Sequence, residues 1–87
     1  DVLKKSVGRK KSLTEMIEVM KEQIVAPKEQ TIFIAHGDCL EEAKEVGGLI
    51  NASMNVKDLF FSYIGPVIGS HSGPGTIAVF FMGKERE

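Results

Sequence analysis

The chain has 87 residues, a formal net charge of −1, 43% hydrophobic residues and 26% charged residues. This length allows at most one small domain, and the ordinary globular composition argues against a disordered or fibrous protein. The near-zero charge argues against nucleic acid as the main partner, and no apolar run is long enough for a helix to cross a membrane.

The first elements predicted are the end of a strand, a basic turn and a helix. Residues 2–3 are expected to end a strand, and five basic residues follow around Gly8, namely Lys4, Lys5, Arg9, Lys10 and Lys11. Ser12 and Glu15 have the spacing of a capping box, which predicts that a helix begins there. Apolar residues at helical spacing extend this helix over residues 12–24, and they are Leu13, Met16, Ile17, Met20 and Ile24.

A buried strand is predicted next. Pro27 stops the first helix, and the β-branched and aromatic residues 31–35 predict a strand that is buried on both faces beside a parallel neighbour. His36 lies at the carboxyl end of this strand, where α/β proteins place ligands. Because Gly37 and a capping Asp38 already account for this segment, we interpret His36 as a turn residue.

The second half of the chain predicts a helix and two strands. Asp38 and Glu41 repeat the capping-box spacing and predict a helix to about residue 54, in which glycines 47–48 allow close packing or a bend. Residues 56–64 are predicted to form a strand with both faces largely covered.

Residues 76–82 are predicted to form the last strand. It follows too soon for a helical crossover, so we expect it to run antiparallel, with Gly83 ending it and residues 84–87 forming a solvated tail. The order β-α-β-α-β-loop-β predicts an α/β fold, a mixed β-sheet with helices packed on it.

The segment between the last two strands, residues 64–75, holds four of the nine glycines and two of the three prolines. Such a composition indicates a rigid loop with uncovered main-chain N–H groups. Ser70, His71 and Ser72 lie at its centre and can all donate hydrogen bonds to a carboxylate or phosphate. Since apolar residues flank the loop on both sides, an amphiphile with an anionic head becomes conceivable as a ligand.

This motif, IGPVIGSHSGPG before an apolar strand, resembles the C-terminal signature of the bacterial DegV family of fatty-acid-binding proteins. Residues 34–38, with Glu41, Glu42 and Ala43 after them, are similar to the family's strand-to-helix turn. The resemblance implies that residues 1–87 are a single-domain fragment, the C-terminal part of a DegV-like protein whose N-terminal domain is absent. The start without methionine or a signal-like region agrees with a fragment.

The resemblance also implies a ligand and a set of ligand-binding residues. The ligand is a long-chain fatty acid, and neither another cofactor nor a metal is expected. His71 is implied to lie near the fatty-acid carboxyl group, while the acyl chain is buried against the missing N-terminal domain. Phenylalanines 60, 61, 80 and 81 can each line an acyl tunnel or pack in the core. The expected ligand-binding residues are His71, Ser70, Ser72, Gly73, Ile64 and Phe81.

Arg9, Lys10 and Lys11 are interpreted as a docking site for a partner. Lys10 and Lys11 precede a helix N-terminus, where a cation opposes the helix dipole, so they are either a solvated turn or a site for an acidic partner. By resemblance that partner is a fatty-acid kinase, which phosphorylates the bound fatty acid. The protein itself is then a carrier and not an enzyme. Cys39 is the only cysteine, which excludes an internal disulfide and fits a reducing cytoplasm.

Two other functions are weighed against the carrier. In a small hydrolase or phosphoryl-transfer enzyme, Ser70 or Ser72 would be the nucleophile and His71 the base. Adjacent side chains seldom point at one another, and neither a G-x-S-x-G elbow nor a phosphate-binding GK[ST] loop is present. In a purely structural module the loop would only connect two strands, which leaves its exposed donors unexplained.

Overall fold

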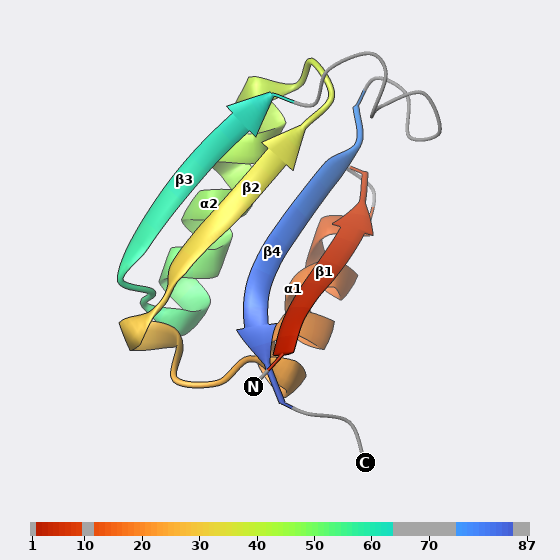
Figure 1. The fold of residues 1–87 in the computed structure, drawn as a ribbon. Helices are drawn as coiled ribbons and strands as arrows, with labels where there is room; N and C mark the ends of the chain where they lie inside the picture. Colours follow the sequence, from red (N-terminus) through yellow and green to blue (C-terminus); the bar gives the residue numbers. More distant parts are fainter. Residues whose placement is uncertain (1, 10–11, 64–74, 85–87) are drawn as a thin grey trace.

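A computed structural model describes residues 2–9, 12–63 and 75–84, which form a four-stranded sheet with two α-helices packed on it (Figure 1). In chain order the elements are β1 (Val2–Gly8), α1 (Leu13–Gln23), the short 3-10 helix η2 (Pro27–Glu29), β2 (Thr31–His36), α2 (Leu40–Met54), β3 (Asp58–Tyr63) and β4 (Ile77–Gly83). The predicted α/β fold class and the order of the elements are confirmed.

The sheet is mixed, with strand order β1-β4-β2-β3. β2 and β3 are parallel, whereas β4 lies between β1 and β2 and runs antiparallel to both. The predictions of a parallel neighbour for β2 and of an antiparallel last strand are therefore confirmed. β1 is longer than expected, because Lys4 and Lys5 belong to this strand and not to a basic turn.

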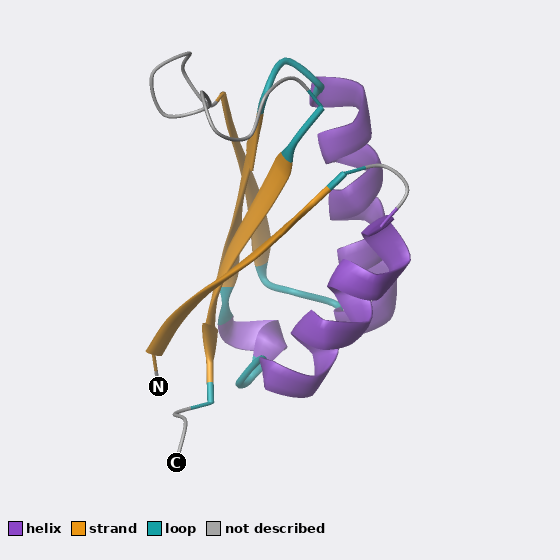
Figure 2. Ribbon diagram, turned by 90° about the vertical axis from the view of Figure 1, so that its right-hand side faces the viewer, coloured by secondary structure: helices purple, strands orange, loops and turns teal. Residues whose placement is uncertain are grey.

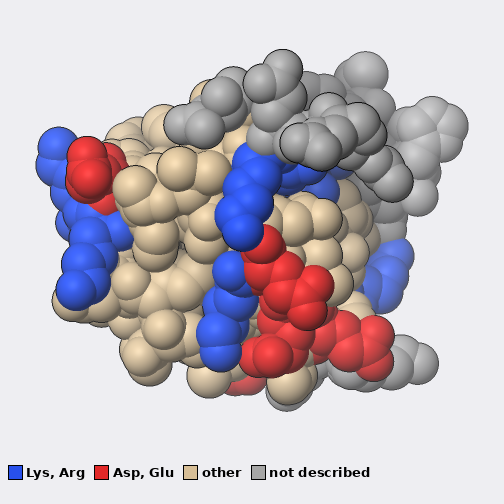
Figure 3. All heavy atoms as spheres, turned by 90° about the horizontal axis from the view of Figure 1, so that it is seen from below, with Lys and Arg blue, Asp and Glu red and all other residues tan. Residues whose placement is uncertain are grey.

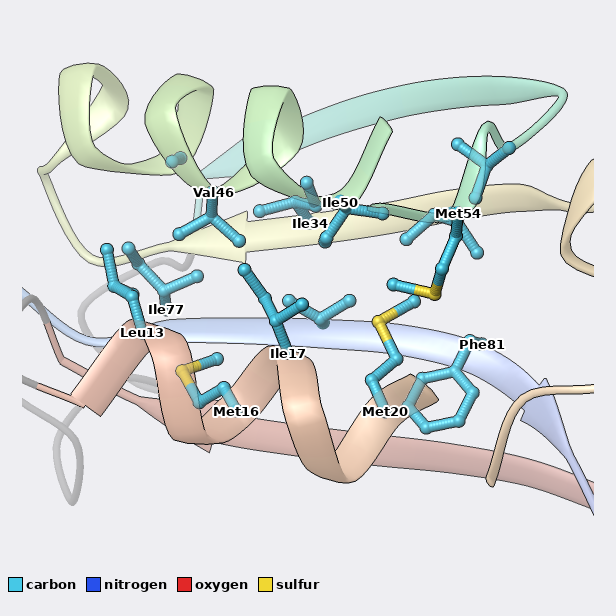
Figure 4. Packing of buried hydrophobic residues seen from close by; sticks show 14 of the residues in the cluster. Leu13, Met16, Ile17, Met20, Ile34, Val46, Ile50, Met54, Ile77 and Phe81 are labelled. Atoms are coloured by element: carbon cyan, nitrogen blue, oxygen red, sulfur yellow. The ribbon is translucent and has the colours of Figure 1, made fainter. Parts of the chain in front are cut away.

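Both helices lie on the same face of the sheet (Figure 2). The core lies between them and the sheet, where side chains of α1 and α2 point toward one another and onto β2 and β4 (Figure 4). The largest fully buried side chains are Met20, Ile32, Ile34, Ile50, Ile77, Val46 and Val79. Among the residues that the structure describes, this two-layer arrangement leaves the opposite face of the sheet without a helix.

Burial in β2 and β3 differs from the prediction for this reason. Residues 31–35 were expected to be buried on both faces, but Thr31 and Phe33 are exposed while Ile32 and Ile34 are buried. β3 was also expected to be covered on both faces, and its Phe60 is exposed. Both expectations were wrong, because α1 and α2 share one side of the sheet.

Neither predicted capping box forms. The Ser12 hydroxyl accepts a hydrogen bond from Arg9 N–H and donates one to the Arg9 carbonyl, both at 3.1 Å, so it closes the turn before α1. At the start of α2 the N-cap residue is Cys39, and Asp38 lies one position earlier with φ of 56°. Both helices nevertheless begin within two residues of the predicted starts.

The Gln30 side chain, just before β2, joins backbone groups of Val25 and Met82 at the lower end of the sheet in Figure 1. Its side-chain Nε2 donates to the carbonyls of Met82, at 2.9 Å, and of Val25, while its Oε1 accepts from Met82 N–H at 2.8 Å. The Gln30 carbonyl also accepts from Lys57 N–H at 3.0 Å. One side chain therefore satisfies backbone groups from two segments far apart in the sequence.

The two glycines of α2 are expected to respond oppositely to alanine. A Cβ on Gly47 would lie 2.9 Å from Cζ of Phe61, so the mutation Gly47→Ala forces the packing of α2 on β3 to shift. Overpacking costs about 1–3 kcal/mol, which outweighs a gain in helix propensity of about 1 kcal/mol. A Cβ on Gly48 meets nothing within 4 Å, so Gly48→Ala should stabilise by about 1 kcal/mol. Urea unfolding gives the free energy of unfolding of both variants. Equal stabilisation by both would show that the Phe61 side chain moves aside at little cost.

Candidate functional site

The candidate site is the end of the sheet where β2 and β3 finish and β4 begins (Figure 1). β3 ends at Tyr63 and β4 begins at Ile77, so the glycine-rich motif connects these two strands in the chain. The predicted residues Ile64, Ser70, His71, Ser72 and Gly73 lie outside the described residues, as do Lys10 and Lys11. Their roles stay predictions.

Reciprocal backbone hydrogen bonds hold the point where the chain rejoins the sheet. Gly75 N–H donates to the Gly37 carbonyl at 2.8 Å, and Gly37 N–H donates to the Thr76 carbonyl at 2.9 Å. Gly75 has φ of +87°, and a Cβ there would lie 3.3 Å from Nη1 of Arg9. A side chain at position 75 would therefore be strained. The two reciprocal hydrogen bonds join the β2–α2 turn to Gly75 and Thr76.

His36 lies under this turn and is 8% exposed. Its Nδ1 accepts a hydrogen bond from Cys39 N–H at 3.2 Å, which requires the neutral ring to carry its proton on Nε2. The imidazole also contacts the Tyr63 ring edge-to-face, with ring centroids 5.9 Å apart. His36 was predicted to be a turn residue, but it is the last residue of β2, and its ring touches Tyr63, the last residue of β3.

The Cys39 thiol is a buried part of the same turn. Burial raises its pKa above the ordinary value, so the thiol stays protonated at neutral pH. Its Sγ donates weakly to the Thr76 carbonyl at 3.6 Å. The thiol thus adds a third contact between the β2–α2 turn and the start of β4.

The sheet face away from α1 and α2, here called the open face, is strongly apolar. Strand register places Phe80, Phe33 and Phe60 in one row across β4, β2 and β3. The Phe33 and Phe60 rings lie 5.6 Å apart and are 50% and 58% exposed. Leu3, at 69%, Val7 and Met82 add exposed apolar surface from the neighbouring strands. Single soluble domains rarely expose so many large apolar side chains on one face.

The two predicted site residues that are described lie in different surroundings. Phe81 points toward the helices and is 2% exposed within the core, and its contact with a ligand stays a prediction. Arg9 is exposed just after β1, with Nη1 of its guanidinium 3.3 Å from where a Cβ on Gly75 would lie. Phe33, Phe60 and Phe80 were not among the predicted ligand-binding residues. Alternation along a strand could have placed them on the open face, because each is next in the chain to a residue that faces the helices.

The described charges do not form one basic surface. Lys4 and Lys5 lie on opposite faces of β1, since their register partners are Phe81 and Phe80. On the side seen in Figure 3, lysine and arginine side chains lie in separate groups beside aspartate and glutamate side chains. Within residues 2–9, 12–63 and 75–84, no group of three His, Cys, Asp or Glu side chains is placed to hold a metal ion. No helix of this part is long and apolar enough to cross a membrane.

Comparison with known proteins gives consistent matches. The family model described as "Uncharacterised protein, DegV family" matches residues 1–84. A DegV domain-containing protein of Clostridium perfringens is 52% identical over 83 residues, which are 95% of this chain and 28% of the relative. This chain therefore spans little more than a quarter of that relative.

Solved structures share both the fold and part of the sequence. A DegV family protein of Ruminococcus gnavus, whose crystal structure is described with vaccenic acid, matches with a TM-score of 0.75 and 30% identity. A hypothetical protein of Thermotoga maritima, whose structure is described as revealing a fatty acid binding function, matches with a TM-score of 0.72 and 29% identity. Each match covers 84% of this chain and 26% of the other.

Proposed function

The chain belongs to the DegV family, and from this premise we propose that it forms one part of a fatty-acid carrier. The observation that carries the proposal is the apolar open face, which lies beside the sheet end that bears the glycine-rich motif. An acyl chain needs apolar surface along its length and polar donors at one end. The open face supplies the first, and residues 70–72 of the motif supply the second.

The acyl chain in this proposal lies between the open face and the part of a family-length protein that is outside these 87 residues. Burial contributes about 0.8 kcal/mol per CH₂ group, but only if water is excluded from both sides of the chain. The open face covers one side alone. Because the solved relatives are about four times longer than the matched part, they have enough additional chain to cover the other side.

The carrier has no catalytic residue of its own in this proposal. Its carboxylate site holds the fatty acid for a separate fatty-acid kinase in the cytoplasm, and the buried Cys39 thiol agrees with a reducing compartment. His71 donates to the carboxylate, with Ser70, Ser72 and Gly73 beside it, and Ile64 contributes an apolar contact. Phe81, which is buried on the helix side of β4, supports the sheet beneath the acyl chain without touching it.

Mass spectrometry of organic extracts tests the function directly. The sample is a family-length protein that contains these 87 residues, and the 87-residue chain alone is the matched control. We expect about one fatty acid per family-length molecule and none in the control. A turnover product would favour the enzyme. The absence of any lipid from the family-length protein would contradict the carrier, and stoichiometric lipid in the control would contradict the need for additional chain.

A charge reversal tests partner docking by the basic residues. Changing Arg9, Lys10 and Lys11 to glutamate in the family-length protein should slow phosphorylation of the bound fatty acid by the kinase at least tenfold at low salt, where exposed charges act most strongly. Fatty-acid affinity, measured by calorimetry, should stay unchanged. The matched control reverses Lys28 and Lys57, which lie at the opposite end of the sheet. Equal phosphorylation in all three proteins would leave these residues as a solvated turn.

A further inference from the structure

His36 contacts the strand residues on either side of the motif, Tyr63 of β3 and Ile77 of β4. At the start, its ring packs against the edge of Tyr63, which is its register partner on β3 and precedes residue 64. At the finish, His36 pairs with Ile77 on β4, and the adjacent Gly37 exchanges backbone hydrogen bonds with Gly75 and Thr76. His36 and the turn after it therefore contact both the residue before the motif and the residues at its end.

The Nδ1 atom of His36 holds this turn in shape. It accepts a hydrogen bond from Cys39 N–H at 3.2 Å. This N–H is at the start of α2, where a capping side chain is the usual acceptor. This bond holds Cys39 where its Sγ reaches the Thr76 carbonyl, while Asp38 adopts φ of 56°. Such a backbone conformation is unfavourable for a residue other than glycine, so the surrounding contacts must maintain it. The loss of the Nδ1 acceptor would release the turn and, with it, the Gly37–Thr76 pairing.

We infer that His36 is a positioning residue for the fatty-acid site: its Nδ1 bond to Cys39 fixes the turn that anchors Gly75 and Thr76, the residues that follow the donors of the motif in the chain. The inference rests on the proposed fatty-acid-binding function. His36 itself does not touch the ligand. Its effect falls on the carboxylate end, because the anchored residues follow the motif directly in the chain.

Two substitutions separate the acceptor of His36 from its ring. In His36→Asn, the side-chain oxygen can take the place of Nδ1, but the ring contact with Tyr63 is lost. In His36→Phe, the ring remains and the acceptor is lost. The protein is the family-length chain, and calorimetry compares a fatty acid with the alcohol of the same length. We expect His36→Phe to weaken binding of the acid about 10-fold and of the alcohol less than about 2-fold, and His36→Asn to bind both almost as the unchanged protein does.

Gln30→Ala is the matched control for stability. Gln30 also satisfies backbone groups of β4, but it lies six residues before His36, about 20 Å along β2. Gln30→Ala should lower the urea midpoint of unfolding as His36→Phe does. Its affinity for the fatty acid should stay unchanged when binding is measured under conditions where both variants are folded. This control separates a general loss of stability from a change at the site.

The remaining outcomes show whether the inference about His36 fails alone or together with the proposed fatty-acid-binding function. If the unchanged protein binds neither fatty acid nor alcohol, the proposed function fails and the inference with it. If the unchanged protein binds and His36→Phe binds equally well, only the inference is overturned. It is also overturned if His36→Asn is as weak as His36→Phe, if acid and alcohol weaken equally, or if Gln30→Ala weakens acid binding to the same extent.

Discussion

Truncating Phe33 and Phe60 together to alanine is expected to weaken fatty-acid binding by a family-length protein about 100-fold. Full burial of an aromatic side chain is worth about 1.5–3 kcal/mol, and these two rings are already half covered by each other and by the sheet. A further contribution of roughly 1.4 kcal/mol from each ring corresponds to a factor of about 100 for the pair. Calorimetric titration with a long-chain fatty acid measures this loss.

Ile34→Ala is the control, because Ile34 is next to Phe33 in the chain but faces the helices and is fully buried. This change should lower the free energy of unfolding by about 2–5 kcal/mol. The affinity of the molecules that remain folded should not change. If the Phe33 and Phe60 double variant binds normally, the acyl chain does not lie on the open face. If Ile34→Ala weakens binding as strongly, the effect is one of fold stability.

The sequence predicts the elements and strand directions well, since both depend on local patterns. The β-branched residues of β2, the helical spacing in α1 and the short final connection each indicate one structure. The exposure of Phe33 and Phe60 depends instead on which side of the sheet the helices cover. Both helices cover the same side, and no local pattern in residues 31–36 or 58–63 indicates this.

The role of the β2–α2 turn was also beyond local reasoning. The segment after β2 contains Gly37 and Asp38, a predicted capping residue, and these were enough to predict a turn. What distinguishes this turn is its contact with Gly75 and Thr76, almost 40 positions later in the sequence. Ser12 illustrates the same limit, because a hydroxyl with the spacing of a capping box bonds to Arg9 instead. Side-chain partners are chosen by tertiary geometry.

The prediction for His71 concerns the carboxylate end of the same ligand. A hydrogen bond to a charged group is worth about 1.5–3 kcal/mol, so His71→Ala in a family-length protein should weaken binding of a fatty acid about 10- to 100-fold. The methyl ester of the same acid lacks the charge that strengthens this bond. Its affinity should fall much less, because the acyl chain contributes most of the binding free energy of both ligands.

The comparison of acid with ester separates recognition of the carboxylate from an effect on loop shape. An equal loss for both ligands would mean that His71 only maintains the conformation of the motif. No loss for either ligand would place the carboxylate elsewhere, and the binding role would pass to the chain outside these 87 residues. His71→Gln is the matched variant, since its amide still donates a hydrogen bond but carries no charge. If His71 is charged when it binds the carboxylate, glutamine should restore only part of the lost acid affinity and leave ester binding unchanged.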